Sequence, residues 1–192
     1  MKTLTKFTLT VALSLLTACA SFQGGKLKPI QEFPNTDNKP SAQVLLKTKA
    51  IINDRPQSSE KRKNKLHGQI ISTMRKTDVF SEVGKLVDEP DLTIDISLVN
   101  DGSFSQVGAF LSGATLTVIP GRATDRFILN ATITNKEGKK RTIHLEESME
   151  TWIHITLLPV TPFKFPGSVA KNIQKQLVEN LVDEMIEKEI IL

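Results

Sequence analysis

The stretch Asp91-Leu92-Thr93-Ile94-Asp95-Ile96-Ser97-Leu98-Val99 alternates between apolar and polar side chains along most of its length. Successive side chains of a β-strand point to opposite faces of a sheet, so this pattern predicts a strand with one buried face and one face in water. Sheets of that kind are antiparallel or mixed, because purely parallel sheets are covered on both faces. The stretch therefore argues against a doubly wound parallel fold.

Further strand patterns flank this stretch on both sides. Before it, residues 43–52 alternate in the same way and end at the breaking sequence Asn53-Asp54-Arg55-Pro56. After it, residues 127–133 and 143–149 alternate on either side of a polar turn that contains Gly138. Two alternating runs joined by such a turn predict a β-hairpin.

Two helices complete the predicted fold. Ser58 or Ser59 can cap a helix whose apolar residues recur at helical spacing, namely Leu66, Ile70, Ile71 and Met74. Pro166-Gly167-Ser168 precedes a second periodic stretch of about six turns. The order of elements predicts an α+β fold: an antiparallel or mixed sheet with one internal helix and a long carboxy-terminal helix packed on one face.

Length and composition are those of a single globular domain. The chain has 192 residues, of which 39% are hydrophobic and 24% charged, and this excludes multi-span membrane proteins and disordered chains. The net charge of +4 falls to +2 if Lys2 and Lys6 are removed with a leader, so no nucleic-acid partner is indicated. The single cysteine excludes an intramolecular disulfide.

The first 19 residues combine a basic start, a short apolar run and small residues before Cys19, which is typical of a secretory signal. Leu16-Thr17-Ala18-Cys19 resembles the lipobox of bacterial lipoproteins. That resemblance implies cleavage between Ala18 and Cys19, a diacylglycerol on the Cys19 thiol and an acyl chain on its new amino group. No other cofactor is indicated, and three acyl chains make a stable membrane anchor.

The residues after the cysteine suggest a destination. Ala20 and Ser21 follow Cys19, whereas an aspartate there marks retention at the inner membrane in the lipoprotein sorting rule. The resemblance therefore implies a lipid anchor at the periplasmic face of the bacterial outer membrane. We expect three regions: a lipoprotein signal peptide over 1–18, the acylated cysteine with a flexible tether over 19–42, and a periplasmic α+β domain over 43–192.

Two further resemblances concern the domain. Residues 44–52, the helix after them, Val79-Phe80-Ser81-Glu82-Val83 and residues 91–96 resemble the α/β domains of the curli-secretion lipoprotein and of the amino-terminal part of the Tol-system propeller protein. Residues 113–120, 126–129 and 151–163 are similar to a group of small uncharacterised bacterial lipoproteins. These resemblances imply a location and a fold class, and they imply no activity.

Two apolar segments, 107–120 and 152–163, are too short to cross a membrane as helices. Their β-branched and small residues favour strands or hairpin arms. They are either core strands buried on both faces or exposed arms that meet a membrane leaflet or a partner protein. In the second interpretation the contacting residues are Leu111, Leu116, Val118, Trp152, Ile155 and Leu157.

The sequence contains no catalytic or metal-ligand motif, because its three histidines stand apart and its only cysteine is assigned to lipid. No small-molecule substrate is indicated either. Basic clusters could touch anionic lipid head groups or lipopolysaccharide phosphates through Lys61, Arg62, Lys63, Lys139, Lys140 and Arg141.

We therefore predict a non-enzymatic accessory or interaction module that meets a protein partner or a second copy of itself. The alternatives are a component of an outer-membrane transport or secretion assembly, acting as a lipid carrier or an oligomeric channel subunit, and a lipoprotein hydrolase.

Overall fold

The computed structural model describes residues 19–35, 38–57, 59–115 and 117–191. The predicted signal peptide, including Ala18, lies outside the described residues. Ser58, one of the two expected helix caps, and Leu116, one of the expected contact residues, lie outside them as well.

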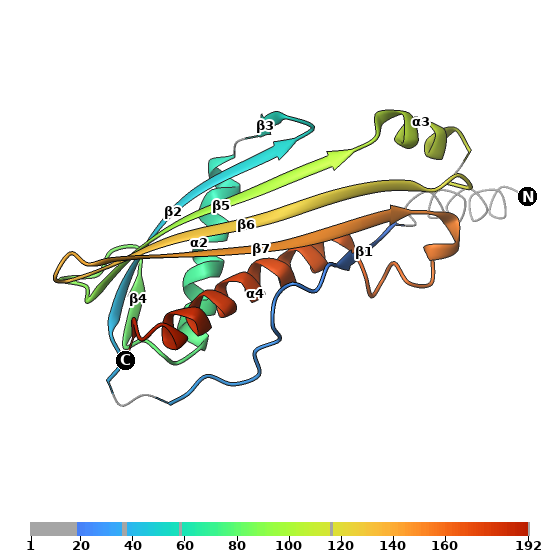
Figure 1. Ribbon diagram of the computed structural model, residues 1–192. Helices are drawn as coiled ribbons and strands as arrows, with labels where there is room; N and C mark the ends of the chain where they lie inside the picture. The colour runs from blue at the N-terminus through green and yellow to red at the C-terminus, as the bar shows by residue number, and fades with distance from the viewer. Residues whose placement is uncertain (1–18, 36–37, 58, 116, 192) are drawn as a thin grey trace, which may run out of the picture.

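The described strands form one mixed sheet of seven strands (Figure 1). Their order across the sheet is β1 (Cys19–Gln23), β7 (Lys140–Ile153), β6 (Gly121–Asn135), β5 (Leu92–Phe104), β2 (Ser41–Ile52) and β3 (Arg55–Gln57), with β4 (Glu82–Gly84) also paired to β2. Strand β2 runs parallel to β5 and to β4, and the other pairs are antiparallel. The predicted mixed sheet and the β6–β7 hairpin are confirmed.

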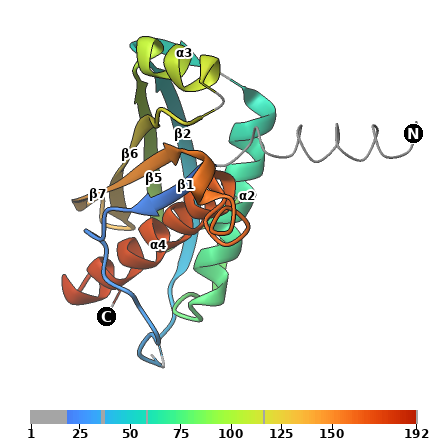
Figure 2. The ribbon, with the colours of Figure 1, turned by 90° about the vertical axis from the view of Figure 1, so that its right-hand side faces the viewer.

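Two long helices, α2 (Glu60–Lys76) and α4 (Pro166–Glu187), lie on the same side of the sheet (Figure 2). Helix α2 begins where expected, since the Ser59 hydroxyl accepts a hydrogen bond from the Arg62 amide at 3.4 Å. Helix α4 has Pro166 in its first turn, where the missing N–H costs no hydrogen bond. The two helices bury the apolar residues Ile70, Ile71, Met74, Ile173, Leu177, Val178, Leu181, Val182 and Met185.

Strand β5, which contains residues 92–99 of the alternating stretch, has one buried face and one face accessible to water. Its apolar residues, Leu92, Ile94, Ile96 and Leu98, are buried in the core. Its polar residues lie on the other face and stay partly accessible to water. The two-faced sheet expected from the alternation is therefore confirmed.

The first apolar segment is neither a core strand nor a hairpin arm. Residues Gln106–Ala114 form a third helix, α3, so the expectation of a single internal helix is wrong. The Ser105 hydroxyl caps this helix by accepting a hydrogen bond from the Gly108 amide at 3.0 Å. The cap thus favours a helix in a stretch whose valine and glycine residues have only a weak helical preference.

The second apolar segment leaves the sheet at Ile153. It continues as a short 3₁₀ helix, η2 (Ile155–Leu157), and a series of turns up to α4. Pro159 and Pro162 have no N–H to donate to a neighbouring strand, so the residues after the 3₁₀ helix are poorly suited to extend the sheet. Neither apolar segment is a buried core strand.

The expected tether differs from the structure in its first part. Residues Cys19–Gln23 form the edge strand β1, in which Ala20 and Ser21 are fully buried. The next five residues run along β7 and α4 and are hydrogen-bonded to both. A composition rich in glycine and lysine suggests flexibility, but the partners of this segment come from residues more than 100 positions away.

Candidate functional site

Cys19 lies at one end of the molecule, where it is the first residue of β1. It pairs with Ile153 on β7, and Ile153 pairs on its other side with Gly121 on β6. Cys19 is partly accessible and forms no disulfide. The residue predicted to carry the acyl chains is therefore held directly by the sheet.

Most of the exposed large hydrophobic side chains gather at this end. We call it the anchor end, and it consists of β1, residues 104–121 and residues 152–165. Nine of the twelve exposed large hydrophobic residues described belong to it: Phe22, Phe104, Val107, Phe110, Leu111, Val118, Ile119, Phe163 and Phe165. Scattered single residues of this kind are ordinary, whereas a concentration at one end indicates a contact surface.

The three parts of the anchor end are tied to one another. The Ser21 amide donates to the Lys164 carbonyl at 2.8 Å, and the Ile155 amide donates to the Thr117 carbonyl at 3.3 Å. Helix α3 packs on β6 so closely that a Cβ on Gly121 would lie 3.3 Å from the Ser112 side chain. Cys19 and Gly121 are two strand spacings apart, or about 10 Å. Cys19, the predicted acylation site, and the apolar side chains thus lie at the same end of the molecule.

The residues expected to contact a membrane or a partner are distributed unevenly. Leu111 and Val118 are exposed, while Trp152, Ile155 and Leu157 are half-buried. The Arg122 guanidinium lies 5.3 Å from the centre of the Trp152 ring.

The three most exposed large hydrophobic side chains of the anchor end were not singled out from the sequence. They are Val107, Phe110 and Phe163, with exposed fractions of 69%, 73% and 82%. Val107 and Phe110 are three residues apart and so share one side of α3. That spacing could have identified them once a helix was assigned there.

A buried carboxylate fixes the chain that follows β1. Glu147 on β7 is fully buried and accepts hydrogen bonds from the Gln23 side chain at 2.9 Å and from the backbone amides of Lys26 and Leu27 at 3.0 and 3.2 Å. Asn180 on α4 accepts from the Lys28 amide at 3.1 Å and donates to its carbonyl at 3.0 Å. We call residues 24–28 the strap, and it holds β1, and with it Cys19, against the domain.

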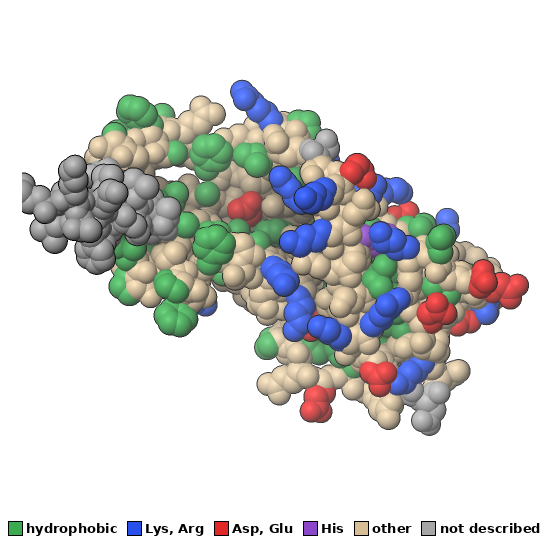
Figure 3. Space-filling model, turned by 180° about the vertical axis from the view of Figure 1, so that it is seen from behind, with side chains coloured by type: hydrophobic (Ala, Val, Ile, Leu, Met, Phe, Trp, Pro, Cys, Tyr) green, Lys and Arg blue, Asp and Glu red, His purple; other side chains and the backbone are tan. Residues whose placement is uncertain are grey.

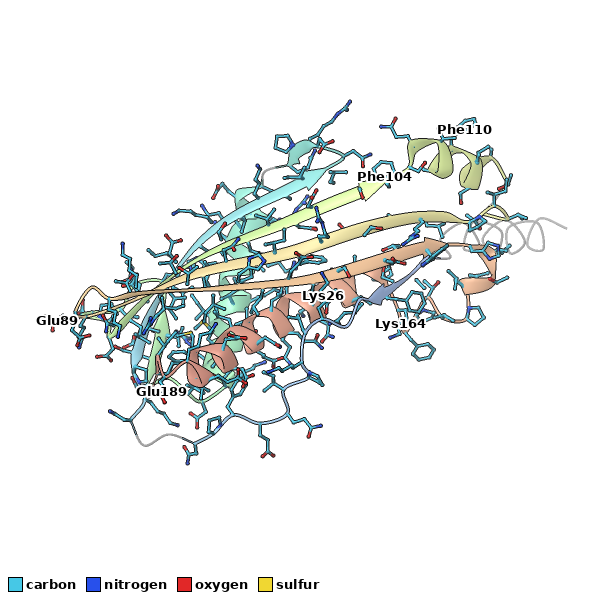
Figure 4. The ribbon with its side chains drawn as sticks, viewed as in Figure 1. Lys26, Glu89, Phe104, Phe110, Lys164 and Glu189 are labelled. Carbon is cyan, nitrogen blue, oxygen red and sulfur yellow. The ribbon has the colours of Figure 1, made fainter. Side chains whose placement is uncertain are left out.

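The opposite end of the molecule is mainly polar, with Leu86 as an exposed large hydrophobic residue. Figure 4 shows Phe104, Phe110 and Lys164 toward one end and Glu89 at the other, beside the β6–β7 turn. The Lys136 ammonium pairs with the Asp91 carboxylate there at 2.8 Å, and together with the hydrogen bonds from Ser41 it holds the pKa of Asp91 well below its usual range. The basic residues Lys139, Lys140 and Arg141 are exposed at the same turn.

The two predicted basic clusters are therefore not brought together. Lys61, Arg62 and Lys63 lie in the first turns of α2, on the side of the sheet that carries the helices. Figure 3 shows basic side chains gathered over the middle of this side.

A groove opens beside the α2 cluster, and we call it the helix groove. Its volume is about 530 Å³, and it is lined by β2, β5 and the first halves of α2 and α4. Arg62, Lys65 and Lys171 stand along it, and Leu66, Leu98 and Ala170 supply apolar lining. Asn100 lines it from β5. Burial of the neighbouring Asp125 raises the pKa of its carboxyl group, and a hydrogen bond with the Asn100 side chain partly offsets this increase.

The described residues contain no group of three histidine, cysteine, aspartate or glutamate side chains that could hold a metal ion. The histidines bond to separate partners: His67 to the Val44 carbonyl, His144 to the Asn130 side chain, and His154 to the Val118 carbonyl and the Thr156 hydroxyl. None of the helices within the described part of the chain has both the length and the apolar character needed to cross a membrane.

Comparison with known proteins gave similarity only at the level of structure. No family model and no curated protein matches the sequence. A minor lipoprotein from Acinetobacter baumannii aligns at 12% identity over 81% of this chain and 96% of its own, with a TM-score of 0.44. The rare lipoprotein B from Shewanella oneidensis aligns at 10% identity over 77% and 96%, with a TM-score of 0.39.

A third similar structure is a PelC dodecamer from Paraburkholderia phytofirmans, at 9% identity over 82% of this chain and 96% of that chain, with a TM-score of 0.23. By their descriptions the first two are bacterial lipoproteins, the class that the sequence resembles.

Proposed function

We propose that this protein is an envelope lipoprotein, anchored through acylated Cys19 at the periplasmic face of the outer membrane, whose domain is a non-enzymatic interaction module. The observation that carries this proposal is the meeting of Cys19 with nine exposed large hydrophobic side chains at one end of the molecule. A protein anchored by a long free linker would have no reason to concentrate apolar side chains beside the acylation site. The alternative role in a transport or secretion assembly stays a prediction.

The anchor and the apolar side chains have different tasks. Three acyl chains supply stable attachment to the membrane. The apolar side chains supply orientation, because transfer of each large one into the lipid interface is favourable by roughly 1.5–3 kcal/mol when complete. Phe110, Val107 and Phe163 come from two different segments, so together they define a plane of contact.

The strap makes this orientation mechanically possible. Since β1 begins at the acylated residue, the first described residues leave no slack between lipid and domain. The wet face of the sheet and the β6–β7 turn then extend away from the lipid. A domain concentrated and oriented in this way meets a periplasmic partner more readily than a freely diffusing one.

The anchor is tested first. Replacing Cys19 with serine is expected to abolish the incorporation of labelled palmitate, because Cys19 is the only cysteine of the chain. Normal labelling of Cys19→Ser would contradict the assignment.

The contact surface is tested separately in a Cys19→Ser protein expressed without residues 1–18, which lacks both the acyl chains and the apolar leader. We expect Phe110→Asp to lower its sedimentation with phospholipid vesicles, since the substitution places a charge in the interface. The matched control is Leu86→Asp, which changes an 86% exposed leucine three residues before Glu89, at the far end. Equal loss in both variants, or no loss in either, would contradict membrane contact by the anchor end.

A further inference from the structure

The helix groove carries a strong excess of positive charge. Four of the residues that line it from α2 and α4 are basic, namely Arg62, Lys63, Lys65 and Lys171, and only Glu60 is acidic. Lys47 and Lys49 border it as well, but on β2 they alternate with the buried Val44 and Leu46, so their side chains point to the other face of the sheet. We propose that this groove is a binding site for a phosphate group, carried either by a lipid or by a soluble compound. The proposal goes beyond membrane anchoring and does not depend on it.

Three of these four helix cations form no ion pair with a described residue. Lys63 pairs with Glu60 at 3.6 Å. Within the described part of the chain, Arg62, Lys65 and Lys171 form no ion pair. They come from two helices, so their charges converge on the groove from both sides. An arginine with lysines around it is the usual donor set for phosphate oxygens.

Neutral groups in the groove add hydrogen-bonding capacity. Gln57, Gln69 and Gln174 line it, and their side-chain amides can donate hydrogen bonds to phosphate oxygens beside the cations.

Small side chains form part of the groove's lining. Ala50 on β2 and Gly167 and Ala170 on α4 line it, and none of them has a side chain longer than a methyl group. The first turns of both helices lie along it as well, and the unpaired amides of a helix start favour an anion. A volume of about 530 Å³ is in the range of ligand sites, about 300–1,000 Å³.

The test is calorimetric titration of the full acylated protein in neutral detergent. One arm uses inorganic pyrophosphate, and the other uses short-chain dihexanoyl phosphatidic acid. We expect saturable binding of at least one probe, and Lys171→Glu to weaken it by roughly tenfold or more, which is what loss of a charge-assisted hydrogen bond implies. Lys171 is exposed, and Lys171→Gln with a smaller loss of affinity serves as a second variant if the glutamate disturbs folding.

The matched control is Lys61→Glu. It makes the same charge change in the same basic cluster, but Lys61 does not line the groove, so less than about a twofold loss is expected from the screened surface charge. Tighter binding of phosphatidic acid than of pyrophosphate would identify a lipid head group, and the reverse order a soluble phosphate. Absence of saturable binding in both arms, or equal loss in Lys61→Glu and the Lys171 variants, would overturn the proposal.

Discussion

The buried carboxylate of Glu147 helps to hold the strap, and with it β1 and Cys19, against the domain. Glu147 and Glu146 are neighbours on β7, yet their surroundings differ completely. Glu147 is fully buried and accepts from the strap, whereas Glu146 pairs at the surface with the Lys26 ammonium at 2.7 Å, which lowers its pKa. The amides that Glu147 satisfies lie about 120 positions away, and no local pattern could indicate them.

We expect Glu147→Ala to lower the free energy of unfolding by about 2–4 kcal/mol, because it leaves buried donors of the strap without an acceptor. Glu146→Ala is the matched control, and loss of its exposed ion pair is expected to cost less than about 1 kcal/mol. Urea denaturation measures both, and hydrogen exchange at the Lys26 and Leu27 amides should accelerate only in the first variant. Equal effects of the two substitutions would show that the strap is not held by Glu147.

At the scale of elements, the sequence predicted what depends on periodicity. The alternation in β5, the β6–β7 hairpin and the long helix α4 all appear where expected, because burial of one face imposes a regular pattern. The helix α3 was missed because it has no buried apolar face that would impose a periodic pattern. Its only buried residue is Ser112. An exposed helix defined by a serine cap leaves a weaker trace in the sequence than a buried one.

The docking of α3 on β6 can be tested at two glycines. Gly121→Val should lower the free energy of unfolding by about 1–3 kcal/mol and loosen α3, since even a Cβ there would press on Ser112 at 3.3 Å. In Gly113→Ala the added Cβ points into open space on the same helix α3. This substitution should raise the free energy of unfolding by about 0.4–1 kcal/mol. Hydrogen exchange of the α3 amides reports the difference. Unchanged exchange in Gly121→Val would contradict close packing of α3 on the strand.

At the scale of the whole molecule, the protein has an apolar end that carries Cys19 and a polar end at the β6–β7 turn (Figure 4). The sequence predicted an anchor at Cys19 and drew attention to the apolar segments separately. It could not bring them together, because their proximity depends on the pairing of β1 with β7 and on the loop contacts of Ser21 and Ile155. The same holds for the helix groove, whose cations come from α2 and α4.

The central claim is that the end carrying Cys19 lies in the lipid interface, and tryptophan depth measurement tests it most directly. Trp152 is the only tryptophan, so Trp152→Phe gives a silent background in which Phe110→Trp and Glu137→Trp place one probe at each end. The acylated proteins are reconstituted in vesicles that contain brominated lipids, which quench tryptophan fluorescence at short range. We expect strong quenching at position 110 and none at position 137, whereas equal quenching at both positions, or none at 110, would contradict the account.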